Sequence, residues 1–452
     1  MSDDARPPLQ QAAGEIEKAV GHLFTVHDLT LGTPDQPYAI RFRGHLSVPS
    51  HQAYPQIAGH LRKLGYTAVL RHDAKSGLDI LLALPGVMPL ESGSRPWVNI
   101  VLYILTVLST LFVGASWSNQ VPPGADAIWF LTHIWLGWPF ALSLMTILTG
   151  HELGHYFAAR YYRVPVSLPY FLPLPIPPFG TLGAVIAMKG QSTNRRQMLT
   201  VGAAGPLTGF VLAVPILILG LTLSTVQPMS MPEAGRVVFL KGNSLLYLLL
   251  KFAVFGQILP GSGLAPEFPA ALKEILAAIL GIVPLTGGYD VFFHPVALAG
   301  WAGLLVTSFN LLPVGQLDGG HVMYSLVGQR AGRLGLPVVI FLVALGFLLW
   351  PGWLLWAALI FLFGRQHPEP LDDVTRLGLL QKIYAAVVMV VFLLVFTPVP
   401  LQIIRGGPSP AGAGQAANWL GFLALVLGST LWLVRRKRNC PNIEDPFRRP
   451  SG

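Results

Sequence analysis

Long apolar runs alternate with short polar segments after residue 96. The first run, 97–117, carries no charged side chain, and about 20 apolar residues are enough for a helix to cross a bilayer. A further stretch, 242–259, is compatible with an interfacial helix, a re-entrant segment or half of an extra hairpin with 271–284. The pattern predicts eight transmembrane helices, at 97–117, 128–150, 198–223, 294–321, 336–350, 352–364, 383–396 and 418–434.

Residues 1–96 are more polar and have a different periodicity. After a loose start, alternating positions predict strands, and one segment has helical spacing, with Ser50 as a candidate cap and Gly65 as its stop. This small domain is expected to be a structural or docking cap, or to gate access to the rest of the chain. The predicted strands are 38–48, 66–73 and 78–86, and the predicted helix is 50–65.

Composition supports a membrane protein. Charged residues make up 11% of the chain, whereas soluble domains carry about 25%. The net charge of +9 does not indicate nucleic-acid binding, because the basic residues flank the apolar runs, where they orient helices in a bilayer. The single cysteine, Cys440, excludes an intramolecular disulfide, a cysteine-rich zinc module and an iron–sulfur cluster.

The basic loops predict an orientation. With the N-terminal domain in the cytoplasm, most loop arginines and lysines fall on the cytoplasmic side, whereas the first opposite loop has none. Both termini are therefore expected in the cytoplasm. The basic residues assigned to that side are Arg160, Arg163, Lys189, Arg195, Arg196, Arg330, Arg333, Arg365, Arg376, Lys382 and 435–438.

The sequence HELGH follows the second apolar run. His151 and His155 are four residues apart, so on a helix their imidazoles face the same side and can share one zinc ion. Glu152 lies beside the first histidine and could accept a proton from zinc-activated water. Three ionisable side chains within a membrane segment are costly, which favours a functional site over an incidental helix end.

A catalytic zinc commonly has three protein ligands and one open position. His133 and His294 are expected near the opposite membrane face from His151. Asp318 is expected at the same face, in a segment whose proline and glycines indicate a broken helix. Asp318 is therefore the candidate third ligand. The simpler interpretation is that Asp318 is only a residue in the C-terminal turn of a helix.

These two motifs, HELGH and NLLPVGQLDGG (310–320), resemble those of the site-2 protease family of intramembrane zinc metalloproteases. The resemblance covers roughly residues 97–365. It implies that His151, His155 and Asp318 bind Zn²⁺, that Glu152 is the general base, and that Asn310 helps to hold the substrate carbonyl or its oxyanion.

The segment after HELGH has six prolines in 164–178, which exclude a regular helix. Residues 180–188 then have the pattern of a strand. A hairpin or re-entrant loop with an open edge could bind an unwound substrate by strand addition, and the family has such an element here. The predicted substrate-binding residues are Gly180, Thr181, Leu182, Gly183, Ala184 and Val185.

Within the family, the sequence resembles the branch without PDZ domains that includes the chloroplast homologues. The N-terminal sequence has neither signal-peptide nor transit-peptide character. The expected location is therefore the plasma membrane of a prokaryote, with the active site near the cytoplasmic face. The expected partners are the bilayer and single-pass transmembrane substrates, whose cleavage serves regulated intramembrane proteolysis or clearance of signal-peptide remnants.

The expected fold is an all-α polytopic membrane protein with a small N-terminal α+β domain and a short membrane-associated β-hairpin. The domains would be 1–96, a protease core at 97–365, and C-terminal helices with a basic tail at 366–452. Two alternatives remain open: a transporter whose cluster binds a travelling metal, and a non-catalytic membrane chaperone. The sequence does not indicate an oligomeric state.

Overall fold

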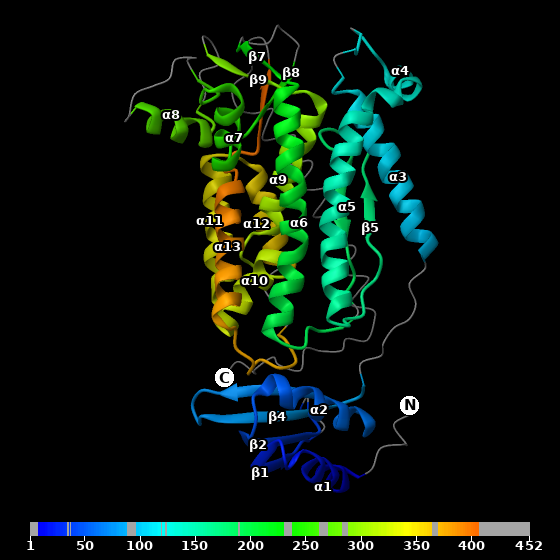
Figure 1. Cartoon of the computed structure of the whole chain (residues 1–452), viewed down its shortest axis with the longest axis vertical. Helices are drawn as coiled ribbons and strands as arrows, with labels where there is room; N and C mark the ends of the chain where they lie inside the picture. The colour runs from blue at the N-terminus through cyan, green and yellow to red at the C-terminus, as the bar shows by residue number, and fades with distance from the viewer. Residues whose placement is uncertain are drawn as a thin grey trace.

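The structure is a computed structural model that describes residues 8–405 with internal gaps. The described chain forms a small mixed domain at one end of a bundle of helices (Figure 1). The predicted eighth span, 418–434, and Cys440 lie outside the described residues. The gaps are 34–35, 37, 88–95, 119, 123, 189, 230–236, 262–269, 283–287 and 364–368.

The N-terminal domain has two helices and one antiparallel sheet, whose strand order is β1-β2-β4-β3. Its core includes Ile16, Phe42, Ile57 and Leu81, all fully buried. The predicted helix and three strands are confirmed. The prediction that the chain starts without regular structure was wrong, because this part contains α1 and β1. The elements are α1 (Leu9–Val20), β1 (Phe24–Leu31), β2 (Ile40–Leu46), α2 (Ser50–Lys63), β3 (Tyr66–Asp73) and β4 (Leu78–Pro85).

The ends of α2 only partly follow the sequence prediction. Gly65 lies just beyond the helix with a φ of +84°, as a helix stop requires. Ser50 is the first helical residue and its side chain makes no capping bond. The prediction that Ser50 caps this helix was therefore wrong: its hydroxyl instead lies 2.6 Å from that of Thr375, from a distant segment.

The first half of the bundle contains the longest helices. Gly137 precedes α5, and Pro139 lies in its first turn, a position that favours a helix start. The prediction of one span at 128–150 was therefore wrong in its bounds, and residues 151–155 lie inside a helix. The elements are α3 (Pro96–Ala115), α4 (Ala127–Thr132), η2 (Ile134–Gly137), α5 (Trp138–Tyr161), β5 (Tyr170–Pro173), β6 (Thr181–Val185) and α6 (Arg195–Thr222).

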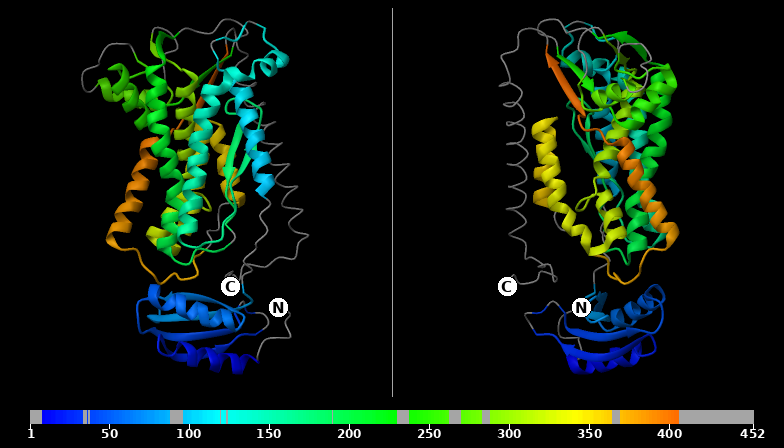
Figure 2. Two further views of the ribbon diagram at one scale, coloured as in Figure 1. Left: turned by 45° about the vertical axis from the view of Figure 1, so that its right-hand side comes forward. Right: turned by 90° about the vertical axis from the view of Figure 1, so that its left-hand side faces the viewer.

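The second half contains shorter helices and two small strand pairs. Strand β7 pairs with β9, and β8 with β10, at the end away from the N-terminal domain (Figures 1 and 2). The ambiguous 242–284 region contains α7 and α8. The elements are β7 (Thr225–Pro228), β8 (Val237–Lys241), α7 (Leu245–Phe255), α8 (Ala270–Ile279), β9 (Tyr289–Phe292), α9 (Pro295–Asn310), α10 (Asp318–Val327), η3 (Gly328–Leu334), α11 (Gly335–Leu348), α12 (Gly352–Phe363), α13 (Leu379–Val395) and β10 (Leu401–Arg405).

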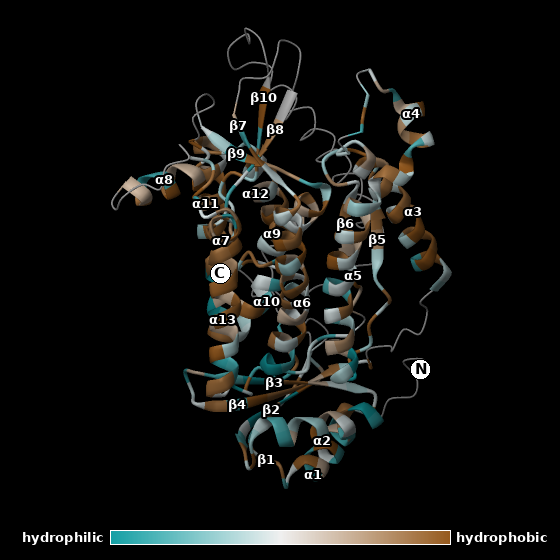
Figure 3. Cartoon of the chain, turned by 45° about the horizontal axis from the view of Figure 1, so that its top comes forward, coloured by the Kyte–Doolittle hydropathy of each residue, from teal (hydrophilic) through white to brown (hydrophobic). Residues whose placement is uncertain are grey.

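The predicted helical membrane fold is confirmed at a coarse level. Apolar residues dominate the bundle helices, whereas the N-terminal domain is mixed (Figure 3). Eight transmembrane helices are not confirmed, because several apolar helices are short. Within the described residues, three helical stretches are long and apolar enough to cross a bilayer: Pro96–Ala115, Arg195–Thr222 and Asp318–Leu348.

Helices α5, α6 and α9 pack against one another at the centre of the bundle. Small residues allow their backbones to approach closely, as in many membrane helix pairs. An added Cβ at Gly300 of α9 would lie 2.6 Å from the Cα of Leu217 in α6. At Gly154 of α5, it would lie 2.6 Å from the carbonyl oxygen of Ala204 in α6. This packing holds the elements that carry the candidate site.

Candidate metal centre

Helix α5 brings the polar residues of HELGH onto its buried side. His151 and Glu152 are only 3% and 6% exposed. The rings of His151 and His155 have their centroids 5.0 Å apart, as the i, i+4 spacing on one helical face requires. The predicted helical presentation of both imidazoles is confirmed.

Asp318 reaches the same point from α10. Its Oδ2 lies 3.6 Å from Nε2 of His151 and 3.2 Å from Nε2 of His155. One ligand atom from each of the three residues can be chosen so that all lie within 4.8 Å of one another. The structure therefore brings together the three predicted metal ligands, although 163 residues separate His155 from Asp318.

A break in the chain between α9 and α10 positions Asp318. Helix α9 ends at Asn310, and Asp318 opens α10 rather than ending a helix. Gly315 in the connection has a φ of +61°, a conformation that favours glycine. At Gly319 and Gly320, an added Cβ would overlap carbonyl oxygens of the connection. The predicted helix break is confirmed, and glycine lets α10 start tightly beside it.

The hydrogen bond of His155 suits a metal ligand. Its Nδ1 lies 2.7 Å from the backbone carbonyl oxygen of Val201 in α6. A carbonyl oxygen only accepts, so Nδ1 carries a proton, and Nε2, 3.2 Å from Oδ2 of Asp318, is the ring atom that would bind a metal. Metal-bound histidines are commonly held in this way. Two imidazoles and one carboxylate are also a donor set that suits zinc, so these residues fit the metal.

Asn310 lies next to this cluster, as predicted. Its Nδ2 is 3.2 Å from Nε2 of His151. His133 and His294 lie elsewhere: His133 stacks on Trp129, and His294 caps the start of α9. Within the described residues, the cluster contains the three expected ligand candidates and no fourth acidic, histidine or cysteine ligand candidate.

The predicted strand after HELGH is confirmed as β6, which pairs antiparallel with β5. The hairpin lies against α3, whose Ser109 hydroxyl donates a 2.6 Å hydrogen bond to the carbonyl oxygen of Gly180. Strand β6 also packs against α5, the helix with the histidines. Leu182 and Val185 are 67% and 54% exposed. The hairpin thus presents apolar side chains beside the helix that carries the cluster.

Sequence reasoning missed the part that α6 plays. Gly202, Gly205 and Gly209 face His321, His155 and His151, respectively. A Cβ on Gly205 would overlap the ring of His155, and one on Gly209 would lie 3.1 Å from Nδ1 of His151. The regular spacing of small residues in 202–209 was the available signal. Helix α6 supplies no ligand, yet its shape makes room for both imidazoles.

Replacing Gly205 with alanine is expected to weaken zinc binding by about 10- to 100-fold, the range seen when groups behind metal ligands change. The reason is that the new methyl group would displace the His155 ring from Asp318. Zinc affinity of the purified protein in detergent measures the effect. Gly335→Ala is the control, because its Cβ would meet no atom within 4 Å. Equal affinities for both variants would contradict this account of α6.

Comparison with known proteins agrees with a metal site at this cluster. Residues 139–349 match Peptidase family M50. The chain is 30% identical over 319 residues to "Probable zinc metalloprotease EGY1, chloroplastic" of Arabidopsis thaliana, an alignment that covers 67% of this chain and 53% of that protein. The protein of the same name from Oryza sativa subsp. japonica is 30% identical over 321 residues, covering 67% and 50%.

"Probable zinc metalloprotease EGY2, chloroplastic" of Oryza sativa subsp. indica is 27% identical over 353 residues, covering 75% of this chain and 58% of that protein. The aligned chain thus spans about half the length of these relatives. No solved structure matches it. The family match encloses all three residues of the cluster, so the chain contains a domain of peptidase family M50, the site-2 protease family, at residues 139–349.

Proposed function

We propose that this chain is an intramembrane zinc metalloprotease that hydrolyses peptide bonds in transmembrane segments of membrane-anchored proteins. The observation that carries the proposal is the convergence of His151, His155 and Asp318, with Glu152 beside them on α5. The family match supports the reaction class. Apolar helices around the cluster support a substrate that lies in the bilayer.

In this proposal the three clustered side chains hold zinc, and Glu152 is the general base. Zinc, when bound, polarises the scissile carbonyl and makes water acidic enough to act as a nucleophile. Glu152 accepts the proton from the attacking water and passes it to the amide nitrogen as the C–N bond breaks. Its near-complete burial supports this role, because few bulk water molecules can compete for the proton.

Asn310 is proposed to hold the carbonyl group of the substrate or its oxyanion. Its amide lies 3.2 Å from His151, within the reach of a carbonyl bound at the cluster. An amide N–H can donate to the oxygen on which negative charge develops, which lowers the barrier by electrostatic stabilisation. A neutral donor also avoids adding another charge to a buried site.

Strand β6 is proposed to bind the substrate as an added strand. A transmembrane helix has its backbone groups in internal hydrogen bonds, so it must unwind before hydrolysis. A strand edge gives the unwound backbone new partners. The exposed side chains of Leu182 and Val185, and the packing of β6 against α5, support residues 180–185 as the place of contact.

The proposed topology has both termini in the cytoplasm, with the site near that face of a plasma membrane. The N-terminal domain, the end of α5 and the start of α6 lie at the same end of the molecule (Figure 2). Arg160 and Arg195 lie at those helix ends, as the positive-inside rule expects. The proposed divisions remain 1–96, 97–365 and 366–452. Single-pass proteins are the proposed substrates.

Two other functions have different consequences. A transporter would release its metal during turnover, whereas the proposed protease retains one zinc per chain. A non-catalytic chaperone would need no general base. Cleavage that depends on Glu152 while zinc stays bound therefore distinguishes the protease from both.

Replacing Glu152 with alanine is expected to reduce cleavage of a transmembrane substrate at least about 100-fold, because the general base is lost. Zinc content should stay at one per chain, since the proposed ligands are intact. Cleavage assays and metal analysis in detergent measure both quantities. Glu17→Ala, on the exposed face of α1, is the control. Normal cleavage by the Glu152 variant would rule out the mechanism.

Shortening Leu182 to alanine is expected to raise KM about 5- to 20-fold, because the lost methine and methyl groups would no longer be buried by substrate. The value of kcat should change less than about twofold, since the cluster is not touched. The control is Val211→Ala on α6, which removes a comparably exposed apolar side chain. An unchanged KM in the Leu182 variant would contradict substrate binding at this strand.

A further inference from the structure

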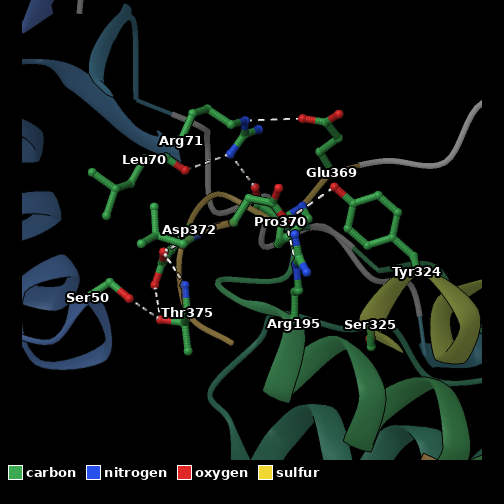
Figure 4. Close-up of polar contacts among 12 residues, drawn as sticks. Ser50, Leu70, Arg71, Arg195, Tyr324, Ser325, Glu369, Pro370, Asp372 and Thr375 are labelled. Carbon is green, nitrogen blue, oxygen red and sulfur yellow. Dashed lines mark hydrogen bonds and ion pairs between the residues drawn. The ribbon is translucent and has the colours of Figure 1, made fainter. Parts of the chain in front are cut away.

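The segment 369–375, here called the latch, lies between the N-terminal domain and the bundle (Figure 4). On one side, its backbone pairs with the edge of β3: Leu70 N–H donates to Leu371 O at 2.8 Å, and Asp373 N–H donates to Leu70 O at 3.1 Å. On the other side, the N–H groups of Leu371 and Asp372 donate to the carbonyl oxygens of Ser192 and Thr193. The latch therefore extends the β3 edge toward the chain that enters α6.

Side chains strengthen the attachment of the latch to the N-terminal domain. Arg71 of β3 pairs with Glu369, with 3.1 Å between Nε and Oε2, and its Nη1 donates to Pro370 O at 2.8 Å. The hydroxyls of Ser50 and Thr375 are 2.6 Å apart. Asp372 is fully buried and accepts from the backbone of Thr375 at 3.2 Å. These contacts join two parts of the chain about 300 residues apart.

On the bundle side, one carboxylate joins two helices. Oδ1 of Asp373 accepts a 2.7 Å hydrogen bond from Nε of Arg195, in the first turn of α6, and a 3.3 Å bond from the hydroxyl of Tyr324 in α10. The Asp373 side chain is only 8% exposed. A hydrogen bond between charged partners is stronger and more directional than a neutral one. Asp373 therefore holds the start of α6 against α10.

Both of these helices determine the geometry of the metal cluster. Helix α10 begins with Asp318, six residues before Tyr324, which corresponds to about 9 Å along a helix. Helix α6 provides the carbonyl of Val201 for His155 and the space at Gly205. A shift of α10 relative to α6 would therefore change the position of the Asp318 carboxylate relative to the His155 ring.

We propose that Asp373 is a positioning residue, and that the latch makes the N-terminal domain part of the catalytic unit. The domain holds the latch, and the latch holds α6 and α10 in the register that brings Asp318 to the histidines. A ligand or protein that moves the domain would thereby change the activity of a site located on other helices. The proposal rests on the proposed function only where activity is the readout.

Amide hydrogen exchange of the full chain in detergent, without added substrate, tests the coupling. Asp373→Ala removes the side-chain bonds from the latch to Arg195 of α6 and Tyr324 of α10, and Arg71→Ala weakens the attachment of the latch to the domain. Both variants are expected to exchange faster than wild type in 318–327, by about tenfold for Asp373→Ala, the effect of losing a charge-assisted hydrogen bond. Asp28→Ala, at an exposed position on β1, is the control and should leave this region unchanged.

Two results would overturn the proposal. Unchanged exchange in 318–327 of Asp373→Ala would show that Asp373 does not position α10. Faster exchange there in Asp373→Ala, but not in Arg71→Ala, would show that the N-terminal domain is not coupled to the site. If Asp373→Ala fails to fold, Asp373→Asn takes its place, since the amide oxygen can still accept hydrogen bonds and only the charge is lost.

Kinetics provide the second readout. In folded Asp373→Asn, kcat for a transmembrane substrate is expected to fall at least about fivefold while KM stays within about twofold, because β6 is untouched. Asp373→Glu, which keeps the charge, should recover part of the loss. A change in KM alone would contradict a positioning role. If wild type shows no cleavage at all, the proposed function fails, whereas the hydrogen-exchange result still decides whether the latch couples the domain.

Discussion

The metal cluster depends on the close approach of α6 to α5 and α10. Two imidazoles on one helix and a carboxylate on another can meet only if a third helix leaves them room. Gly205 and Gly209 provide that room, and the carbonyl of Val201 fixes the orientation of the His155 ring. In a bilayer, where apolar side chains gain little by leaving lipid for protein, such small-residue packing is a main source of helix association.

The interruption between α9 and α10 is the second requirement. It places an amide at the end of one helix and a carboxylate at the start of the next, both beside His151. Irregular backbone is costly at membrane depth unless protein surrounds it. Leu311, Leu312 and Val314 are at most 3% exposed, so the connection is enclosed by the bundle. The break therefore forms part of the site at a limited energetic cost.

The sequence predicted the chemistry of the site better than its surroundings. HELGH and Asp318 could be recognised because each motif is local and combines residue types that seldom occur together in a membrane segment. The small residues at 202–209 could indicate a close helix contact, but neither the His155 partner of Gly205 nor the latch could be predicted, because both depend on which segments meet in three dimensions. Ser50 illustrates the difference: local spacing made it a helix cap, whereas its partner is Thr375. The N-terminal α1 and β1 were missed for a related reason, since α1 buries its apolar face only in the folded domain and β1 is an edge strand defined by its pairing with β2.

X-ray absorption spectroscopy of the zinc-loaded protein tests the central claim that His151, His155 and Asp318 share one metal ion. The account predicts two imidazole nitrogens at about 2.0–2.1 Å, with oxygen ligands completing a roughly tetrahedral shell. In His155→Ala, one imidazole contribution should disappear. A wild-type spectrum without imidazole scattering, or one that the His155 variant leaves unchanged, would contradict the claim.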